Sequence, residues 1–224
     1  MASALSEISK RIRACGYAYL ASFKPNSTTM QIATELGEPI EISGIPTVQQ
    51  IVPREQENAP RNLYSGNYGL GHFPLHTDLA HWYIPPHYII LRCIVPSSTV
   101  FTRLIEFARC LRGIPESTIQ RAQFLPRRNV AGKKHLLRVY QEIEAYHLLR
   151  WDELFIVPAN HEAVEVQNPL ILAMSKCSPV ELSLSHPADT LIIDNWRMLH
   201  GRSSVPLNGL ERIVERAYLG EFKE

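Results

Sequence analysis

The second half of the chain is divided into short apolar segments by Pro, Asn and Gly, and this division constrains the fold most strongly. The segments have the length and the β-branched character of strands. No glycine-rich phosphate loop is present, and the helical patterns are confined to the front half and one insert. A mainly β protein with flanking helices around a double-stranded β-helix, or jelly-roll, core is therefore predicted. The candidate strands are residues 136–143, 147–151, 180–184, 190–194, 198–201 and 212–222.

The first half mixes both element types. Apolar residues at spacings of three and four predict a helix over residues 3–14, and a second helix capped near Ser27 is expected to end at Leu36. A third helix is expected over residues 102–111, because Leu104, Ile105, Ala108 and Leu111 would share one face. Strands are expected over residues 17–23, 47–54 and 88–95, with a polar loop over residues 55–71.

Length and charge limit the class of protein. A chain of 224 residues is short for two full domains, so residues 1–224 are expected to form a single domain. The formal net charge of +1 gives no electrostatic case for nucleic acid or an acidic membrane, and no apolar run would span a bilayer. A small-molecule substrate fits better. The start shows no secretory signal, so a cytoplasmic protein is expected, and a homo-oligomer is left open.

Two histidines and an aspartate suggest a metal site. His76 and Asp78 form an HxD triplet, and His200 follows 124 positions after His76. Side chains at i and i+2 of a strand point to the same face, so an HxD at a strand end aims an imidazole and a carboxylate at one point. Two imidazoles and one carboxylate on one face of an octahedron leave three positions open, as in non-haem Fe(II) oxygenases.

Other polar residues permit two interpretations each. The basic cluster at residues 127–134 is either a solvated loop or a lid over an anionic substrate. Arg150 either packs within a strand or binds a substrate carboxylate. The remaining histidines have no comparable context and are interpreted as surface or core residues, with His81 close enough to support the ligands.

The order and spacing of these residues resemble a known family. The segment His76-Thr77-Asp78, the segment from Asn195 to Ser203 and the closing Glu211–Arg216 are similar to the taurine dioxygenase and clavaminate synthase-like family of Fe(II), 2-oxoglutarate-dependent oxygenases. The resemblance runs from about residue 16 to the C-terminus. Two departures are the short chain and Asp78, since the clavaminate branch tends to place Glu there.

The resemblance implies a role for each matching residue. His76, Asp78 and His200 would be the catalytic iron ligands. Arg212, twelve residues after His200, would bind the far carboxylate of 2-oxoglutarate, with Thr99 supporting the same carboxylate. A guanidinium suits that task because it pairs with carboxylates through two hydrogen bonds and keeps its proton. Arg216 would either join this cofactor-binding site or face the substrate.

The implied reaction is the hydroxylation of an unactivated C–H bond. With Fe(II), 2-oxoglutarate and O2 as cofactors, a dioxygenase of this kind would oxidise a small polar or carboxylate-bearing, amino-acid-like metabolite and release succinate and CO2. Desaturation and cyclisation remain open, as does the substrate. Two alternatives from other classes are a non-catalytic jelly-roll binding or scaffolding protein and a Zn-dependent hydrolase that uses the same three ligands.

Overall fold

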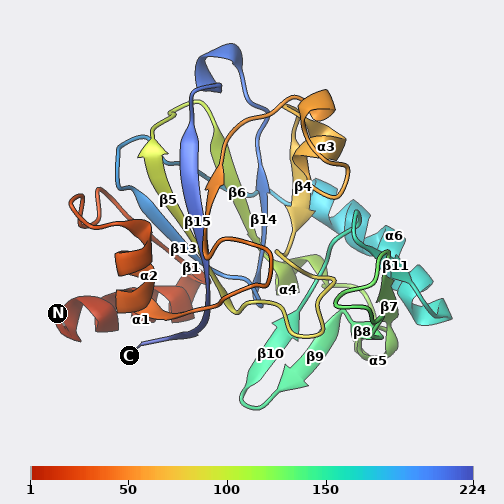
Figure 1. Cartoon of the computed structure of the whole chain (residues 1–224). Coiled ribbons are helices and arrows are strands. Elements are labelled where there is room, and N and C mark those ends of the chain that lie inside the picture. Colours follow the sequence, from red (N-terminus) through yellow and green to blue (C-terminus); the bar gives the residue numbers. More distant parts are fainter. Residues whose placement is uncertain (1, 224) are drawn as a thin grey trace.

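The computed structural model describes residues 2–223 and contains two facing antiparallel sheets (Figure 1). The larger sheet has the order β1 (Tyr17–Leu20), β13 (Thr190–Asp194), β5 (Tyr88–Val95) and β15 (Ile213–Phe222), and both β2 (Gly37–Pro39) and β3 (Val48–Ile51) pair with the outer edge of β15. The smaller sheet has the order β12 (Val180–Ser183), β6 (Phe101–Glu106), β14 (Met198–Arg202) and β4 (Phe73–His76). This is the jelly-roll core that the sequence predicts.

Strand alternation separates the buried residues into layers. On β5, Ile89 and Leu91 face the smaller sheet, where they pack in one cluster with Leu104 of β6 and Met198 of β14. Ile90, between them in sequence, belongs to a different cluster on the outer face of the larger sheet. Because successive side chains of a strand point to opposite faces, β5 is apolar on both sides and lies buried in the middle of the molecule.

Helices cover the outer face of the larger sheet. Helix α1 (Ala2–Cys15) buries Ile8 and Ile12, and α2 (Thr29–Leu36) buries Ile32 and Leu36, all in one cluster with Ile90. Helix α2 begins at a capping box in which the Thr28 side chain accepts a hydrogen bond from the amide of residue 31. Both helices lie on one side of the molecule in Figure 1.

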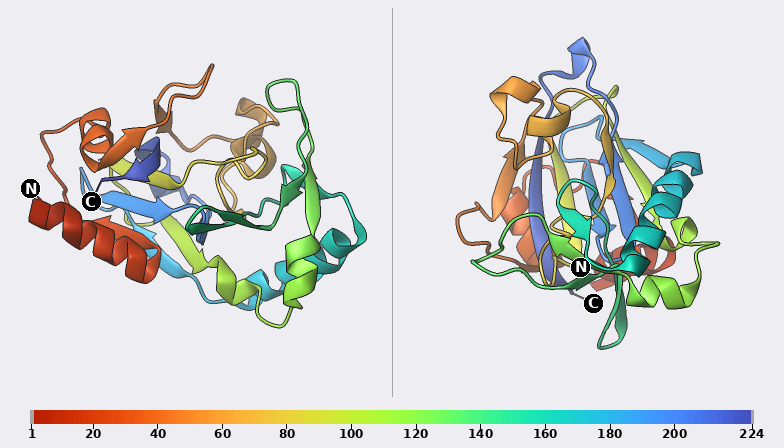
Figure 2. Two further views of the ribbon diagram at one scale, coloured as in Figure 1. Left: turned by 90° about the horizontal axis from the view of Figure 1, so that it is seen from below. Right: turned by 90° about the vertical axis from the view of Figure 1, so that its right-hand side faces the viewer.

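The outer face of the smaller sheet is covered by the middle of the chain. The elements there are α4 (Phe107–Cys110), α5 (Glu116–Arg121), β7 (Gln123–Pro126), β8 (Leu137–Arg138), the hairpin of β9 (Tyr140–Ile143) and β10 (Tyr146–Leu149), β11 (Ile156–Pro158) and α6 (His161–Lys176). Figure 2 shows these elements on the side opposite α1. The remaining short elements are η1 (Gln56–Asn58), α3 (Ser65–Tyr68) and η2 (Leu207–Gly209).

One expected helix is wrong and one helix was not expected. The segment predicted as a helix over residues 102–111 is mostly strand β6, followed by the single turn of α4. Thr102 and Leu104 are buried while Arg103 is partly exposed, so the alternation of a strand prevails over the helical spacing. Helix α6, the longest in the described part, was not predicted because Pro169 interrupts its pattern and its apolar face is narrow. No helix within residues 2–223 is long and apolar enough to cross a membrane.

Candidate metal centre and its cavity

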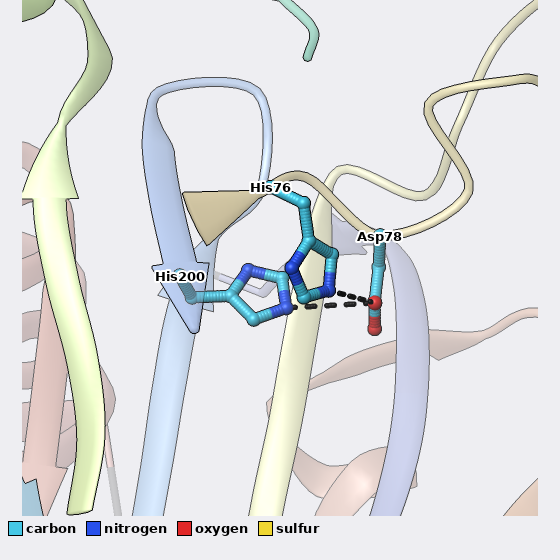
Figure 3. Close-up of side chains that lie close together, drawn as sticks. All are labelled: His76, Asp78 and His200. Carbon is cyan, nitrogen blue, oxygen red and sulfur yellow. Dashed lines mark ion pairs between the residues drawn. The ribbon is translucent and has the colours of Figure 1, made fainter. Parts of the chain in front are cut away.

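His76, Asp78 and His200 converge inside the mouth of the sandwich (Figure 3). His76 ends β4 and stands directly opposite His200 in the antiparallel pairing with β14. Residues opposite each other in such a pair have Cβ atoms about 5 Å apart on one face, and the two imidazole centroids lie 4.5 Å apart. The strand register therefore brings together two histidines that are 124 positions apart in sequence.

Gly201 permits this close pairing. A Cβ on Gly201 would lie 2.7 Å from the carbonyl oxygen of Phe73 on β4, closer than any side chain tolerates. The register shifts between His200 and Arg202, so β4 approaches β14 at an irregular point. A glycine directly after His200 is thus required by the backbone contact.

The donor atoms fit a small transition-metal ion. The Nε2 atoms of His76 and His200 lie 3.5 and 3.4 Å from Oδ1 of Asp78. Neighbouring ligands of an octahedral ion with bonds of ~2.1 Å lie about 3 Å apart, so small side-chain adjustments suffice. Nδ1 of His76 lies 2.8 Å from the carbonyl oxygen of Pro74, and a proton on Nδ1 would leave Nε2 free to bind metal. All three side chains are buried.

Asn195 fixes the backbone at Asp78. Its side-chain oxygen accepts a hydrogen bond from the amide of Asp78 at 2.8 Å, and its side-chain nitrogen donates to the carbonyl oxygens of Asp78 and Pro86. The amide of Thr77 donates to the carbonyl oxygen of Trp151. Leu79 then turns the chain away with a positive φ of 55°. The carboxylate is therefore presented from a backbone held on both sides.

The second oxygen of Asp78 is bound by two other side chains. Oδ2 accepts hydrogen bonds from Nη1 of Arg216 and from the hydroxyl of Tyr218, both at 2.9 Å. Burial by itself would raise the pKa of Asp78, but the charges of Arg216 and His200 outweigh it and hold the pKa well below its usual range. Asp78 is therefore ionised at neutral pH, as a metal ligand must be.

The pKa values of the two imidazoles are shifted in opposite directions. Burial opposes the charged form of both rings, but hydrogen bonding and charge from Asp78 raise the pKa of His76 above its usual value. The pKa of His200 is lowered by burial and by repulsion from His76. A metal ion binds only the unprotonated Nε2 atoms, so metal and protons compete for this site.

A cavity of about 340 Å³ opens beside the three residues. Arg212, the residue directly before β15, lines this cavity and is only 6% exposed. Among the described residues, its guanidinium makes no hydrogen bond or ion pair, and its Nε is buried without a partner. Burial lowers the pKa of Arg212 to about 10, so the group stays charged at neutral pH. A buried cation without a counter-charge points to an anionic ligand in the cavity.

Arg202 stands close to Arg212 but is already engaged. Its guanidinium donates to the carbonyl oxygens of Gly69 and Gly71 and lies 3.6 Å above the ring of Phe73. Burial and the charge of Arg212 together lower the pKa of Arg202 to about 10. The positive potential at this end of the cavity is therefore larger than Arg212 alone provides.

Thr99 lies outside the cavity, in the turn between β5 and β6. Its hydroxyl is 3.2 Å from Oδ1 of Asn208 and 3.3 Å from the hydroxyl of Ser97. Thr102, three residues later, is 5% exposed and lines the cavity together with Arg212. Thr99 is thus not among the residues that line the cavity, because the chain turns before β6 begins at Phe101.

Tyr64 and Asp152 form a second polar end of the cavity. The ring of Tyr64 stacks on His76 with centroids 4.0 Å apart, and its buried hydroxyl lies beside Asp152. Oδ1 of Asp152 accepts hydrogen bonds from the amides of Leu154 and Phe155, at 2.8 and 3.0 Å. Burial raises the pKa of Asp152 to about 6 although the charge of His76 opposes this. Burial and Asp152 also hold the pKa of Tyr64 well above its usual value.

Of the other residues considered from the sequence, some stabilise the fold and some line the cavity. Arg150 is fully buried and donates to the carbonyl oxygens of Ala80, Trp82 and Tyr83, so it braces the loop after Asp78 and does not reach the cavity. His81 lines the cavity with a buried, unpartnered Nδ1. The basic side chains at residues 127–134 lie outside the cavity lining.

Several cavity residues were not identified from the sequence. Tyr64 lies in a segment interpreted only as a loop, Thr102 lies in a segment interpreted as a helix, and Tyr218 sits on a strand without a motif. One available signal was the spacing of Tyr218 from Arg216, since residues i and i+2 of a strand share a face.

Comparison with known proteins gives a match in structure but not in sequence. No protein-family model and no curated protein sequence matches the chain. Among solved structures, an asparagine oxygenase with Fe(II), 2S,3S-3-hydroxyasparagine and succinate superposes with a TM-score of 0.75 at 18% identity, covering 98% of this chain and 79% of that one.

Two further solved structures have the same fold. The non-heme iron oxygenase OrfP with Fe and alpha-ketoglutaric acid matches with a TM-score of 0.74 at 16% identity, over 98% of this chain and 80% of that one. PvcB from Pseudomonas aeruginosa matches with a TM-score of 0.67 at 16% identity, over 96% and 79%. The chain therefore has the jelly-roll fold of Fe- and 2-oxoglutarate-dependent oxygenases.

Proposed function

We propose that the protein is an Fe(II)- and 2-oxoglutarate-dependent dioxygenase that hydroxylates an amino-acid-like metabolite. The observation that carries the proposal is the pairing, in one cavity, of a two-histidine, one-carboxylate cluster with a buried arginine that lacks a counter-charge. The cluster supplies metal ligands, and the arginine supplies a site for an anion. Solved structures with this fold that contain Fe and alpha-ketoglutaric acid support the same function.

His76, Asp78 and His200 would hold the iron through two Nε2 atoms and one carboxylate oxygen. Three ligands on one face leave three positions of an octahedral ion open. The bound iron and 2-oxoglutarate supply the oxidising chemistry, with succinate and CO2 as products. The chain's own contribution is to orient the ligands and to enclose the reaction. Tyr64, stacked on His76, shields one imidazole from solvent.

Arg212 would bind the far carboxylate of 2-oxoglutarate. A planar guanidinium forms two parallel hydrogen bonds to a carboxylate, and such charge-assisted pairs are stronger than neutral ones. We assign the supporting hydroxyl to Thr102 in place of Thr99, because Thr102 is buried in the same cavity. Arg202 adds positive potential nearby.

The substrate would lie between the metal ligands and the opposite end of the cavity. There Asp152 presents a buried carboxylate, and Tyr64 presents a buried hydroxyl beside it. A donor group such as an ammonium or an amide satisfies both. Arg54, which is exposed at the cavity lining, is available for a substrate carboxylate. Solved structures with this fold contain 3-hydroxyasparagine and (3S)-hydroxy-L-Arg, which are products of amino-acid oxidation.

The alternatives explain less of the cavity. A Zn-dependent hydrolase would use the three ligands and an activated water but has no need of a buried cation without a counter-charge. A non-catalytic binding protein would not require a cluster of three buried metal-binding side chains.

An anaerobic spectrum tests the proposal. Purified protein with Fe(II) and 2-oxoglutarate is expected to develop a visible charge-transfer band that requires both additions. Omitting either component, or replacing His200 by Ala, should remove the band. Protein that binds Zn(II) tightly but gives no band with Fe(II) and 2-oxoglutarate would favour the hydrolase. Screening amino acids for stimulated succinate release would then identify the substrate.

A further inference from the structure

We propose that Arg216 and Tyr218 are positioning residues that confine the metal contact of Asp78 to a single carboxylate oxygen. This inference rests on the proposed function and concerns a residue whose role the sequence left open between cosubstrate and substrate binding. It follows from the partners of the two carboxylate oxygens, which are different.

Both terminal nitrogens of Arg216 are already occupied by protein groups. Nη1 donates to Oδ2 of Asp78 at 2.9 Å, and Nη2 donates to the side-chain oxygen of Gln49 at 2.7 Å. Gln49 stands opposite Arg216 in the antiparallel pairing of β3 and β15. The guanidinium is thus held in one orientation from two strands, with one N–H group of each terminal nitrogen bound to a protein oxygen.

Tyr218 completes the coordination of the same oxygen. Its hydroxyl donates to Oδ2 of Asp78 at 2.9 Å, and its ring lies 4.9 Å from the guanidinium of Arg216. A carboxylate oxygen has two lone pairs, and Oδ2 receives two donors. Oδ1 receives neither donor and faces the Nε2 atoms of His76 and His200.

This division decides how many positions remain on the metal. If Asp78 bound through both oxygens, the three residues would fill four of the six octahedral positions and leave two. A 2-oxo acid that binds through its carboxylate and ketone needs two, so none would remain for a third ligand. With Oδ2 held by Arg216 and Tyr218, Asp78 fills one position and three stay open.

Metal affinity separates this role from the others. In an anaerobic titration with Co(II) as the probe, Arg216→Met is expected to raise the dissociation constant by about 10- to 100-fold, the range for losing a partner of a metal ligand. Tyr218→Phe removes one donor with little change in shape and is expected to raise it about tenfold. The Co(II) visible spectrum should change in both variants, because the binding mode of Asp78 changes.

Arg197→Met is the matched control. Arg197 also pairs with a carboxylate, Glu106 at 2.7 Å, but lies outside the cavity lining. Its replacement should leave both the Co(II) affinity and the spectrum unchanged, although the melting temperature falls. Arg216→Met is expected to lower the melting temperature as well, so only the metal readouts distinguish a positioning role from a purely structural one.

Three outcomes overturn the inference. One is an unchanged Co(II) affinity and spectrum in Tyr218→Phe, which remains informative even if Arg216→Met does not fold. Another is a normal metal affinity in Arg216→Met together with a tenfold or larger rise in its 2-oxoglutarate requirement. The third is a normal metal affinity in Arg216→Met together with a tenfold or larger rise in its substrate requirement alone. Failure of the wild-type protein to bind Fe(II) or Co(II) would reject the proposed function itself.

Discussion

Arg212 and Arg216 lie four residues apart at the same cavity, yet they stand in opposite electrostatic situations. Arg216 has a partner at each terminal nitrogen, including the carboxylate of Asp78. The guanidinium of Arg212 has no such partner among residues 2–223, although the residue is only 6% exposed. A charged side chain with protein partners holds those partners in place, whereas a buried charged side chain without a partner is available to bind a ligand of opposite charge. The pair thus separates the metal end of the cavity from the cosubstrate end.

Removing a metal ligand should have the largest effect. His76→Ala, Asp78→Ala or His200→Ala is expected to abolish Fe(II) binding and reduce turnover below detection, because only three side chains hold the ion. Circular dichroism should show a folded protein, since the three apolar layers do not depend on the metal. His161→Ala, at an 82% exposed side chain, is the control. Full 2-oxoglutarate-dependent turnover in any one of the three variants would remove that residue from the site.

The next largest effect should be a difference in the free energy of unfolding between variants of the two arginines, measured in the metal-free protein. Arg216→Met leaves Asp78 without its main counter-charge and is expected to cost roughly 3 kcal/mol, the lower end for a broken buried pair, because the Arg216 side chain is 25% exposed. Arg212→Met removes a buried charge without a partner and is expected to be neutral or stabilising. Urea unfolding of both variants measures the contrast. Equal destabilisation would show that Arg212 has a protein partner in solution.

Asp152 is a carboxylate buried at the same cavity, and its effect on stability can be tested by varying the pH. Burial raises its pKa to about 6 from an ordinary value of 3.8. The folded state therefore binds a proton more tightly than the unfolded state, and stability should fall as pH rises from about 4 to about 6 and then level off. This rise in pKa corresponds to a change of roughly 2–3 kcal/mol in the free energy of unfolding. Asp152→Asn should lose the share of this dependence that Asp152 contributes and keep that of Asp194, whose pKa burial also raises to about 6, as monitored by urea unfolding across the pH range. A variant with the wild-type pH profile would assign the dependence to another group.

The two threonines should show the smallest difference. Thr102→Val is expected to raise the 2-oxoglutarate requirement about three- to tenfold, as for a neutral hydrogen bond of about 1 kcal/mol. Thr99→Val should leave it unchanged, because that hydroxyl contacts Asn208 and Ser97 outside the cavity. The reverse pattern would restore Thr99 to the site. Initial rates at varied 2-oxoglutarate decide between them.

The sequence carried information about strands and ligands more fully than about the cavity. The spacing of the HxD triplet and His200 predicted the convergence that β4 and β14 create, because strand geometry turns spacing directly into direction. It did not reveal Thr102, since the apolar spacing around Leu104 fits a helix as well as a strand and only pairing with β12 and β14 decides. Nor did it separate Arg212 from Arg216, because partners such as Gln49 and Asp78 come from distant strands.

Recognition of the far carboxylate by Arg212 is tested most directly by comparing two 2-oxo acids. Anaerobic titrations of the Fe(II) protein with 2-oxoglutarate and with 2-oxopentanoate, which lacks that carboxylate, give the contribution of the charged end. The wild-type protein should prefer 2-oxoglutarate by about 10- to 100-fold, which matches 1.5–3 kcal/mol for a hydrogen-bonded charge. Arg212→Met should bind both acids equally weakly, while Arg197→Met keeps the preference. A preference that persists in Arg212→Met would contradict the assignment of this residue to the cosubstrate.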